Sequence, residues 1–327
     1  MPEPKNSSNQ SAGAQRPPIE HFVAPVDETP VASVDAVRIR EKKSNLWLDA
    51  WRDMRRRPMF WISAAIILLV VLVSLFPGWF TSVDPRASSL ANSNGAPEPG
   101  HPLGFTKQGY DVYARIVYGA STSVSVGLIV IAITFVVGTV MGALAGFFGG
   151  FVDTVLSRIG DVFFSIPYIL AAVVVMSVMQ DYRNPLVIAF AIGGFSWPIT
   201  ARIVRGEILR VKNADFVMAA ESLGLSRFAT LVRHVLPNGL APAIVVTTLS
   251  LSSAIVAEAT LSFLGVGLPP GQFISWGNDI SAAQLSLRTD PMPLIYPSLA
   301  LSITVLGFVM LGEVVRDALD PKARARR

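Results

Sequence analysis

The chain consists of long apolar stretches separated by polar segments. Six stretches hold about 18 to 28 residues each with almost no charge, and about 20 apolar residues in a helix cross the hydrocarbon core of a bilayer. They cover residues 59–80, 121–148, 162–179, 186–204, 240–264 and 294–312. The stretches lack strand-length alternation, and a helix satisfies its own backbone hydrogen bonds where no water is present. The pattern predicts an all-α protein, a polytopic transmembrane helical bundle with about six spans.

Composition narrows the possible chemistry. Of the 327 residues, 51% are hydrophobic and 15% are charged, whereas about 25% of the residues of a typical soluble domain are charged. The chain has no cysteine, which excludes disulfides, thiol nucleophiles and thiolate metal ligands. Only three scattered histidines remain, so we predict no metal site.

The basic residues are distributed unevenly between the polar segments. A net charge of +4 is compatible with nucleic-acid binding, but the positions of the charges indicate membrane topology instead. With the amino terminus inside, 22 of the 27 lysines and arginines lie on the cytoplasmic side. The other five are Arg86, Lys107, Arg115, Arg183 and Arg288. Because basic residues accumulate in cytoplasmic loops, we predict a multi-pass protein in membrane lipid with both termini cytoplasmic and no nucleic-acid partner.

The two ends of the chain differ from its centre. Residues 1–44 are rich in proline, serine, asparagine and charge, which predicts a disordered cytoplasmic tail. Residues 45–115 hold an amphipathic segment with two tryptophans, the first span and an external loop. The first apolar stretch begins too late for a cleavable signal peptide, so we expect this span to be retained. Residues 319–327 form a basic cytoplasmic tail.

Two features inside the spans predict helix geometry. Gly138, Gly142 and Gly146 place a small residue at every fourth position of the second span, a pattern typical of close helix packing. The partner helix is either in this chain or in another subunit. Pro167 in the third span lacks a backbone N–H, which predicts a kink there.

The segment from Arg202 to Pro237 is too polar to insert but strongly patterned. Asn213 is a suitable N-cap, Asp215 favours the first helical turn, and Gly224 ends the helix. This first helix has an apolar face made by Phe216, Ala219, Ala220 and Leu223.

A second amphipathic helix follows in the same segment. Ser226 can cap it and Pro237 is expected to stop it. Its apolar face is made by Phe228, Leu231, Val232 and Val235. By pattern alone the two helices could lie on the lipid surface.

The residues of this segment resemble the EAA loop of ABC importer permeases, in the stretches 215–224 and 233–238. In that family the loop, here 213–237, forms coupling helices that dock into a groove of a separate ATPase subunit. Met218 stands where the motif usually has Glu, and Glu221 supplies a charge nearby. The resemblance assigns ATPase coupling to Phe216, Met218, Ala219, Ala220, Glu221, Gly224, Arg227, Leu236 and Pro237.

Further motifs resemble the C-type subunit of dipeptide and oligopeptide permeases. They lie at 101–104, 109–112, 118–120, 146–153, 196–198, 201–207, 258–265, 275–277 and 316–321, and the likeness covers residues 46–321. The chain departs from that branch at Phe105, Thr106 and Tyr110 in the external loop. The resemblance implies an ABC type I importer permease fold with its transmembrane domain at 116–318, in a bacterial cytoplasmic (inner) membrane.

The same resemblance implies a function and partners. The chain would form half of a translocation path for dipeptides or oligopeptides, in a heterodimer with a B-type permease subunit. Two ABC ATPase subunits and an extracytoplasmic solute-binding protein would complete the importer. Other cargoes, such as nickel chelates or oligosaccharides, remain alternatives within this branch.

The sequence also indicates what the chain does not do alone. No G-x-x-x-x-G-K-[ST] motif occurs, so we expect no cofactor on this chain, no catalytic residues, and ATP hydrolysis by partner subunits. A secondary transporter, the rival class, usually has ionisable residues at mid-membrane. Glu258 is the only acidic residue in the predicted spans, and we place it near the outer boundary. It is either a carboxylate satisfied by its neighbours or a pore-mouth or gate residue.

Overall fold

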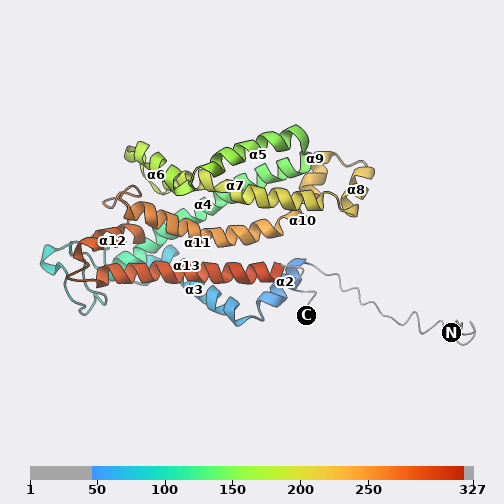
Figure 1. Ribbon diagram of the computed structural model, residues 1–327. Coiled ribbons are helices and arrows are strands. Elements are labelled where there is room, and N and C mark those ends of the chain that lie inside the picture. Colours follow the sequence, from blue (N-terminus) through green and yellow to red (C-terminus); the bar gives the residue numbers. More distant parts are fainter. Residues whose placement is uncertain (1–45, 320–327) are drawn as a thin grey trace, which may run out of the picture. The chain divides into compact units, whose positions relative to one another are not determined.

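The computed structural model describes residues 46–319, which form helices joined by loops (Figure 1). The α-helices are α2 (Leu46–Met54), α3 (Pro58–Leu75), α4 (Val112–Phe148), α5 (Gly150–Ser165), α6 (Tyr168–Val178), α7 (Pro185–Val211), α8 (Asp215–Ser222), α9 (Arg227–Thr230), α10 (Leu236–Gly239), α11 (Ala241–Phe263), α12 (Trp276–Ala283) and α13 (Met292–Leu319). A π-helix covers Leu231–Val235, and short 3-10 turns cover Pro77–Trp79, Leu90–Asn92, Gln180–Tyr182 and Gln284–Ser286. Within 46–319 no strand forms beyond isolated β-bridges, and the all-α prediction is confirmed. The predicted tail at 1–44 lies outside the described residues. The predicted tail at 319–327 also lies outside them, except for Leu319.

Among the described residues five helices are long and apolar enough to cross a membrane, namely α3, α4, α7, α11 and α13, and the bent pair α5 and α6 makes a sixth if it forms one broken span. The pair is bent by 78°. Ile166, between the two helices, has an extended backbone with φ −97° and ψ 120°. A residue before proline is disfavoured in the helical region, and Pro167 offers no N–H to continue the helix. The kink predicted at Pro167 is therefore a complete break.

The long helix α4 begins earlier than predicted, at Val112 instead of residue 121. Its N-cap is Asp111, whose Oδ1 accepts a hydrogen bond of 2.5 Å from the Ala114 amide. The other carboxylate oxygen of Asp111 lies 2.7 Å from Nδ1 of His101. At about 1.5 Å per residue, 37 residues span about 55 Å, so α4 extends beyond about 30 Å of hydrocarbon.

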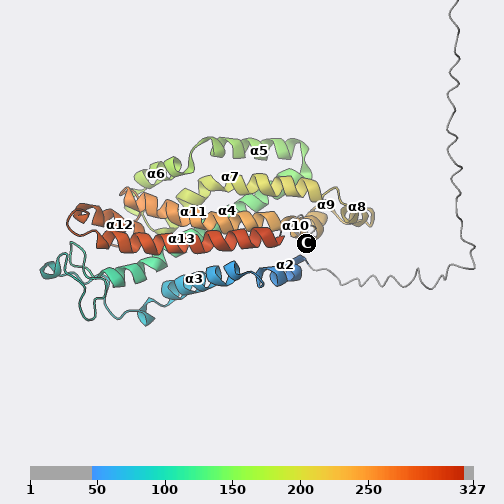
Figure 2. The same ribbon diagram turned by 60° about the horizontal axis from the view of Figure 1, so that its bottom comes forward.

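The helices run side by side, so the described part of the chain has two opposite ends (Figures 1 and 2). Helix α4 packs along α7, α11 contacts both α4 and α13, and α3 contacts α13. Helices α8 and α9 lie at one end, and α12 lies at the other, beside the loops that follow α3. We call these the coupling end and the outer end.

The amphipathic helix α2 packs against the end of α13. Ala50 is buried in an apolar cluster with Ala318 and Leu319. Nη1 of Arg57 lies 2.5 Å from Oδ2 of Asp317, and its Nη2 lies 2.9 Å from Oδ2 of Asp53. The predicted amphipathic segment therefore packs in part against the carboxyl-terminal end of α13.

Candidate functional site

Helix α8 is fixed to the bundle by one side only. Val217 and Ala220 are 2% and 7% exposed, and Val217 belongs to an apolar cluster with Ile208 and Val211 of α7. The predicted cap is wrong, because the N-cap is Ala214 and no side chain caps α8. The Asn213 side chain instead donates a hydrogen bond of 3.1 Å to the Leu209 carbonyl at the end of α7. An asparagine side chain can bond backbone groups that precede or follow it in the chain, and here it bonds a carbonyl at the end of α7.

Gly224 ends α8 in the conformation that only glycine adopts freely. Its φ is 87°. The Leu225 amide donates to the Ala220 carbonyl at 3.2 Å, and the Gly224 amide donates to the Glu221 carbonyl at 2.9 Å. These two bonds form a Schellman motif, which reverses the chain towards α9.

The second coupling helix is longer and less regular than predicted. Ser226 caps it as expected, accepting a hydrogen bond of 3.3 Å from the Ala229 amide. The prediction that Pro237 stops the helix is wrong. The π-helix leads into α10, in which Pro237 occupies the first turn, and α10 leads into α11. Proline is tolerated in a first turn because its missing N–H would have no intrahelical partner there.

The two coupling helices leave an exposed apolar surface at the coupling end. Leu231 and Val235 face the bundle and are 3% and 0% exposed. The exposed apolar side chains, which we call the docking face, are Phe216, Met218, Leu223, Phe228 and Val232. Several large apolar side chains exposed on neighbouring helices are typical of a protein-binding surface.

The remaining residues assigned to this site divide between docking and support. Ala219, Glu221 and Pro237 are exposed, and Leu236 is partly buried. The Arg227 guanidinium lies 5.9 Å from the ring centres of both Phe147 and Phe148 at the end of α4. Arg227 therefore holds the loop against α4 by cation–π contact.

The glycines of α4 lie against α7 of the same chain. A Cβ atom on Gly138 would lie 2.7 Å from Cβ of Thr200, and one on Gly142 would lie 2.9 Å from Cβ of Val204. A Cβ atom on Gly146 would lie 2.8 Å from the Arg205 carbonyl oxygen. These separations are below normal contact distances, so the two backbones approach in a way that only glycine permits.

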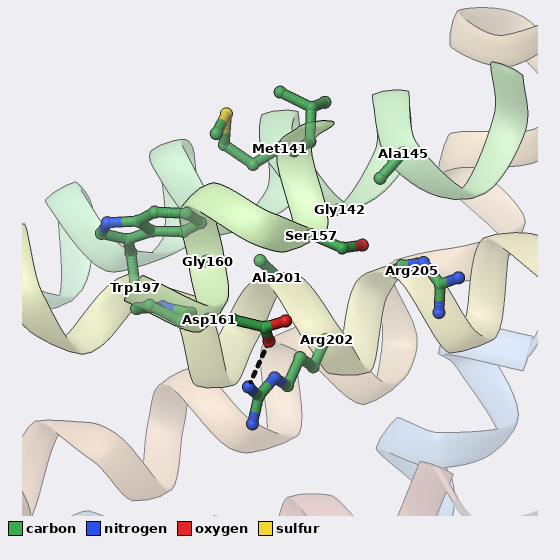
Figure 3. Close-up of a pocket in the computed structure, with 12 residues that line it drawn as sticks. Met141, Gly142, Ala145, Ser157, Gly160, Asp161, Trp197, Ala201, Arg202 and Arg205 are labelled. Carbon is green, nitrogen blue, oxygen red and sulfur yellow. Dashed lines mark hydrogen bonds and ion pairs between the residues drawn. The ribbon is translucent and has the colours of Figure 1, made fainter. Parts of the chain in front are cut away.

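A cavity of about 410 Å³ lies between α4, α5 and α7 (Figure 3). Ion pairs join α5 to α7 along it. Nη2 of Arg202 lies 2.8 Å from Oδ1 of Asp161. Arg205 forms two bonds to Asp153, of 2.5 and 2.7 Å, and Ser157 donates to the same carboxylate at 3.0 Å. A two-pronged arginine–carboxylate pair fixes geometry as well as charge.

Sequence reasoning missed these links between α5 and α7. Arg158, the basic residue nearest to Asp161 in the sequence, lies 3.7 Å from its carboxylate, further than Arg202. Asp153 and Arg205 both stand in stretches that resemble the permease branch, which was the available signal. Their pairing depends on how α5 folds back along α7, and local sequence does not specify that.

Glu258 lies at the outer end and joins three helices. It is 0% exposed. Ser123 of α4 donates a hydrogen bond of 2.9 Å to its Oε2, and Ser262 of α11 donates one of 2.9 Å to its Oε1. The Ser275 hydroxyl, which caps α12, also bonds this carboxylate. Of the two roles considered for Glu258, the geometry fits a carboxylate satisfied by its neighbours, and the gate role stays a prediction.

We expect Glu258→Leu to destabilise the outer end, because three buried hydroxyls lose their acceptor at about 1 kcal/mol or more each. Glu258→Gln keeps one acceptor oxygen and should lie between leucine and wild type. The measurement is the thermal unfolding midpoint of the purified permease in detergent. Val256→Ala is the control, on the same helix at a side chain that is 42% exposed. Equal midpoints for Glu258→Leu and Val256→Ala would rule out this role.

Among residues 46–319 no group of three or more His, Asp or Glu side chains is placed to hold a metal ion.

Comparisons with known proteins agree with this architecture. Residues 138–325 match the family described as binding-protein-dependent transport system inner membrane component. Residues 45–97 match the N-terminal transmembrane domain of oligopeptide transport permease C.

Curated relatives match over most of their length. The oligopeptide transport system permease protein OppC of Bacillus subtilis is 34% identical over 89% of this chain and 94% of its own length. The dipeptide transport system permease protein DppC of Alkalihalophilus pseudofirmus is 32% identical over 85% and 91%. The glutathione transport system permease protein GsiD of Escherichia coli is 34% identical over 92% and 97%.

A solved structure shares the fold. The MetNI methionine ABC transporter in inward-facing conformations matches with a TM-score of 0.52 and 17% identity, over 62% of this chain and 96% of the matched chain. At this identity the likeness shows the fold alone. The chain therefore belongs to the family of inner-membrane components of binding-protein-dependent transport systems, and its fold is that of an ABC importer permease.

Proposed function

We propose that the chain is the C-type permease subunit of an ATP-driven importer of dipeptides or oligopeptides. The observation that carries the proposal is the docking face, an apolar surface on two helices that are fixed to the bundle by Val217, Leu231 and Val235. The names of the relatives support peptides as the cargo. Nickel chelates and oligosaccharides remain the alternatives.

In this proposal the docking face binds one of two ABC ATPase subunits. A B-type permease subunit completes the translocation path, and an extracytoplasmic solute-binding protein delivers the cargo. The partners hydrolyse ATP, and this chain binds no cofactor and catalyses no reaction. A secondary transporter fits less well, because the serines at the outer end already engage Glu258, the acidic residue of the spans.

The chain would transmit movement along a nearly unbroken helical path. From Arg227 to Phe263 the π-helix joins α9 to α10, and α10 leads into α11. A π turn within helices is a common place of functional bending. When the ATPases close, the coupling helices move with them, and α11 carries this movement towards Glu258 and α12. The permease then alternates between inward and outward access.

Peptide uptake by membrane vesicles tests the proposal. We expect ATP-dependent uptake of a labelled dipeptide or tripeptide by vesicles holding the full importer and solute-binding protein. Vesicles lacking this chain should show none. Uptake of a nickel chelate without uptake of any peptide would reject the peptide cargo and keep the permease role. Uptake that persists without ATP but follows an ion gradient would reject the ABC mechanism.

We further propose that both termini are cytoplasmic in a bacterial inner membrane. The chain has no cysteine of its own, so a single introduced cysteine reports its own side. Ser93→Cys, at an exposed position in the loop before α4, should react with a membrane-impermeant maleimide on intact cells. Arg56→Cys, at an exposed position between α2 and α3 and outside the docking face, should react only after permeabilisation. The reverse pattern would invert the topology.

A further inference from the structure

A pocket of about 140 Å³ lies among four helices of the bundle, α4, α6, α7 and α11. Its walls include six side chains that carry a hydroxyl group, namely Thr134, Tyr168, Ser196, Thr200, Ser250 and Ser253. We call it the hydroxyl pocket. Its volume corresponds to about five waters, because one water occupies about 30 Å³ of liquid. A group of that size inside the pocket is close to all of its walls.

The hydroxyl pocket lies near the middle of the membrane-crossing helices. Thr134, Ser196 and Ser253 each lie within one residue of the centre of the apolar stretch that their helix provides. These stretches cross the hydrocarbon, so the pocket is near the middle of the bilayer. Many transporters bind their cargo at this depth, because each side of the membrane reaches it in turn.

Three hydroxyl groups of the pocket, those of Thr200, Ser250 and Ser253, have no hydrogen-bond partner among the described residues. Other hydroxyls on α11 donate to the carbonyl group one turn earlier, as Thr248 and Thr260 do at 2.8 and 2.7 Å. Ser250 and Ser253 do not bond their own helix in this way. A polar group without a partner is costly at this depth, so these hydroxyls favour a partner from outside the described chain.

The free hydroxyl oxygens are also accessible. Ser253 is an exposed residue that lines the pocket. The hydroxyl oxygens of Thr200 and Ser250 keep accessible surface, in contrast to those of Thr139 and Thr247, which are buried without a partner. A ligand in the pocket can therefore reach these oxygens without a rearrangement of the helices.

The walls define the chemistry of the ligand. A hydroxyl group can donate one hydrogen bond and accept others. Among the described residues no Asp, Glu, Lys, Arg or His side chain lines the pocket, and its other walls are Val130, Ile192, Ile199 and Ala254. A charged group would lose its hydration here without an opposite charge to compensate it. An amide is neutral and presents both an N–H donor and a carbonyl acceptor, which matches these walls.

We propose that the hydroxyl pocket holds an uncharged amide group of the transported molecule as it crosses the membrane. The hydroxyls of Thr200, Ser250 and Ser253 exchange hydrogen bonds with its N–H and carbonyl groups. The site rests on the proposed function and deepens it, because it names what this chain recognises in a peptide. It recognises the peptide bond, and the charged groups of the cargo lie outside the pocket.

The first test asks whether water reaches the pocket in the complete importer. The chain has no cysteine, so Ser250→Cys and Ser253→Cys each add a single thiol of similar size. The importer is placed in lipid nanodiscs and treated with a charged methanethiosulfonate, both at rest and during ATP turnover. We expect both thiols to react, which is measured as an increase in the mass of this chain.

Two controls accompany the labelling. Ser252→Cys should stay unreactive, because Ser252 is 5% exposed, does not line the pocket and donates to the Leu249 carbonyl at 2.6 Å. Leu68→Cys, on a side chain 59% exposed on the apolar helix α3, reports a thiol that faces lipid and should also stay unreactive. If Ser250→Cys and Ser253→Cys react no faster than these controls, lipid or another helix covers the pocket and the proposal is overturned.

The second test compares a neutral tripeptide with its depsipeptide analogue. The ester of the analogue lacks the amide N–H, and its carbonyl is a weaker acceptor. Ser253→Ala should lower ATP-dependent uptake of the tripeptide about fivefold, the loss expected for one hydrogen bond, and uptake of the ester much less. Each rate is divided by the wild-type rate for the same cargo, so the preference of the solute-binding protein cancels. Ser252→Ala is the matched control and should lower neither rate.

A charged variant gives an independent readout. Ser253→Asp adds a carboxylate to the pocket and should lower uptake of tripeptides with an acidic side chain more than uptake of tripeptides with a lysine. A variant that only disturbed helix packing would lower both alike. Equal losses for the acidic and basic tripeptides would therefore mean that the cargo passes elsewhere.

Failure of this site differs from failure of the proposed function. If the wild-type importer takes up no peptide, the proposed function is wrong. If it takes up the tripeptide and Ser253→Ala behaves like Ser252→Ala, only the hydroxyl pocket is rejected. Equal losses of tripeptide and ester uptake in Ser253→Ala would also reject it, because the serine would then act on the structure and not on the amide.

Discussion

Replacing Gly142 by leucine is expected to prevent the stable packing of α4 on α7. A Cβ atom at this position would already lie 2.9 Å from Cβ of Val204 and closer still to the Ala201 carbonyl oxygen. The neighbouring atom of Ala201 belongs to the backbone, so the two helices must separate along their length. Overpacking typically costs about 1–3 kcal/mol, and we expect a loss at the upper end of that range or beyond. The measurement is the yield and thermal unfolding midpoint of the permease in detergent.

The matched control for Gly142→Leu is Gly206→Leu on α7. A Cβ atom on Gly206 would meet nothing within 4 Å, so leucine there adds the same bulk without entering the contact between α4 and α7. Gly142→Ala should give an intermediate loss, because its Cβ alone is already too close. A normal yield and midpoint for Gly142→Leu would mean that the α4–α7 contact does not hold the fold together.

Gly224→Val is expected to uncouple the permease from its ATPase without unfolding the bundle. Gly224 has a φ of 87°, and a Cβ atom there would meet nothing within 4 Å. The penalty is therefore conformational, about 1–2 kcal/mol or more for a β-branched residue in the left-handed region. The chain should escape it by changing the turn between α8 and α9, which misplaces Phe216 relative to Phe228 on the docking face.

The measurement compares ATPase copurified with the variant and with wild type at equal permease expression, together with peptide uptake. We expect about a tenfold loss of retained ATPase at limiting concentration, which corresponds to about 1.4 kcal/mol. Gly224→Asn is the matched variant, because asparagine tolerates positive φ, and it should retain most of the ATPase. Equal retention and normal uptake for Gly224→Val would argue for a loop that rests on lipid and against coupling.

Gly142 and Gly224 both determine how the coupling helices are positioned. Gly142 allows α4 to pack closely against α7. Helix α7 ends at Val211, which lies in the same apolar cluster as Val217 of the coupling loop. Gly224 then sets the angle between the two coupling helices. A variant at Gly142 should therefore damage both the fold and the coupling, whereas one at Gly224 should damage the coupling alone.

The errors of sequence reasoning at the coupling loop have a common physical origin. Asn213 has the right chemistry for an N-cap, but its side chain bonds the Leu209 carbonyl, because the end of α7 also needs partners. A proline usually ends a helix, but Pro237 follows the π-helix and lies in the first turn of α10. The local sequence determines which bonds and backbone positions a residue can adopt, and the neighbouring elements determine which of them it adopts.

The sequence by itself determined the all-α class, the apolar spans, the kink at Pro167 and the turn at Gly224. These features depend on local causes, namely hydrophobic length, a missing N–H and a positive φ, which are present in any context. Only the tertiary structure decided that the glycines of α4 pack against α7 of the same chain, that Asp153 pairs with Arg205, and that Glu258 joins three helices. Those contacts join residues far apart along the chain, and their partners depend on how the helices are arranged in space.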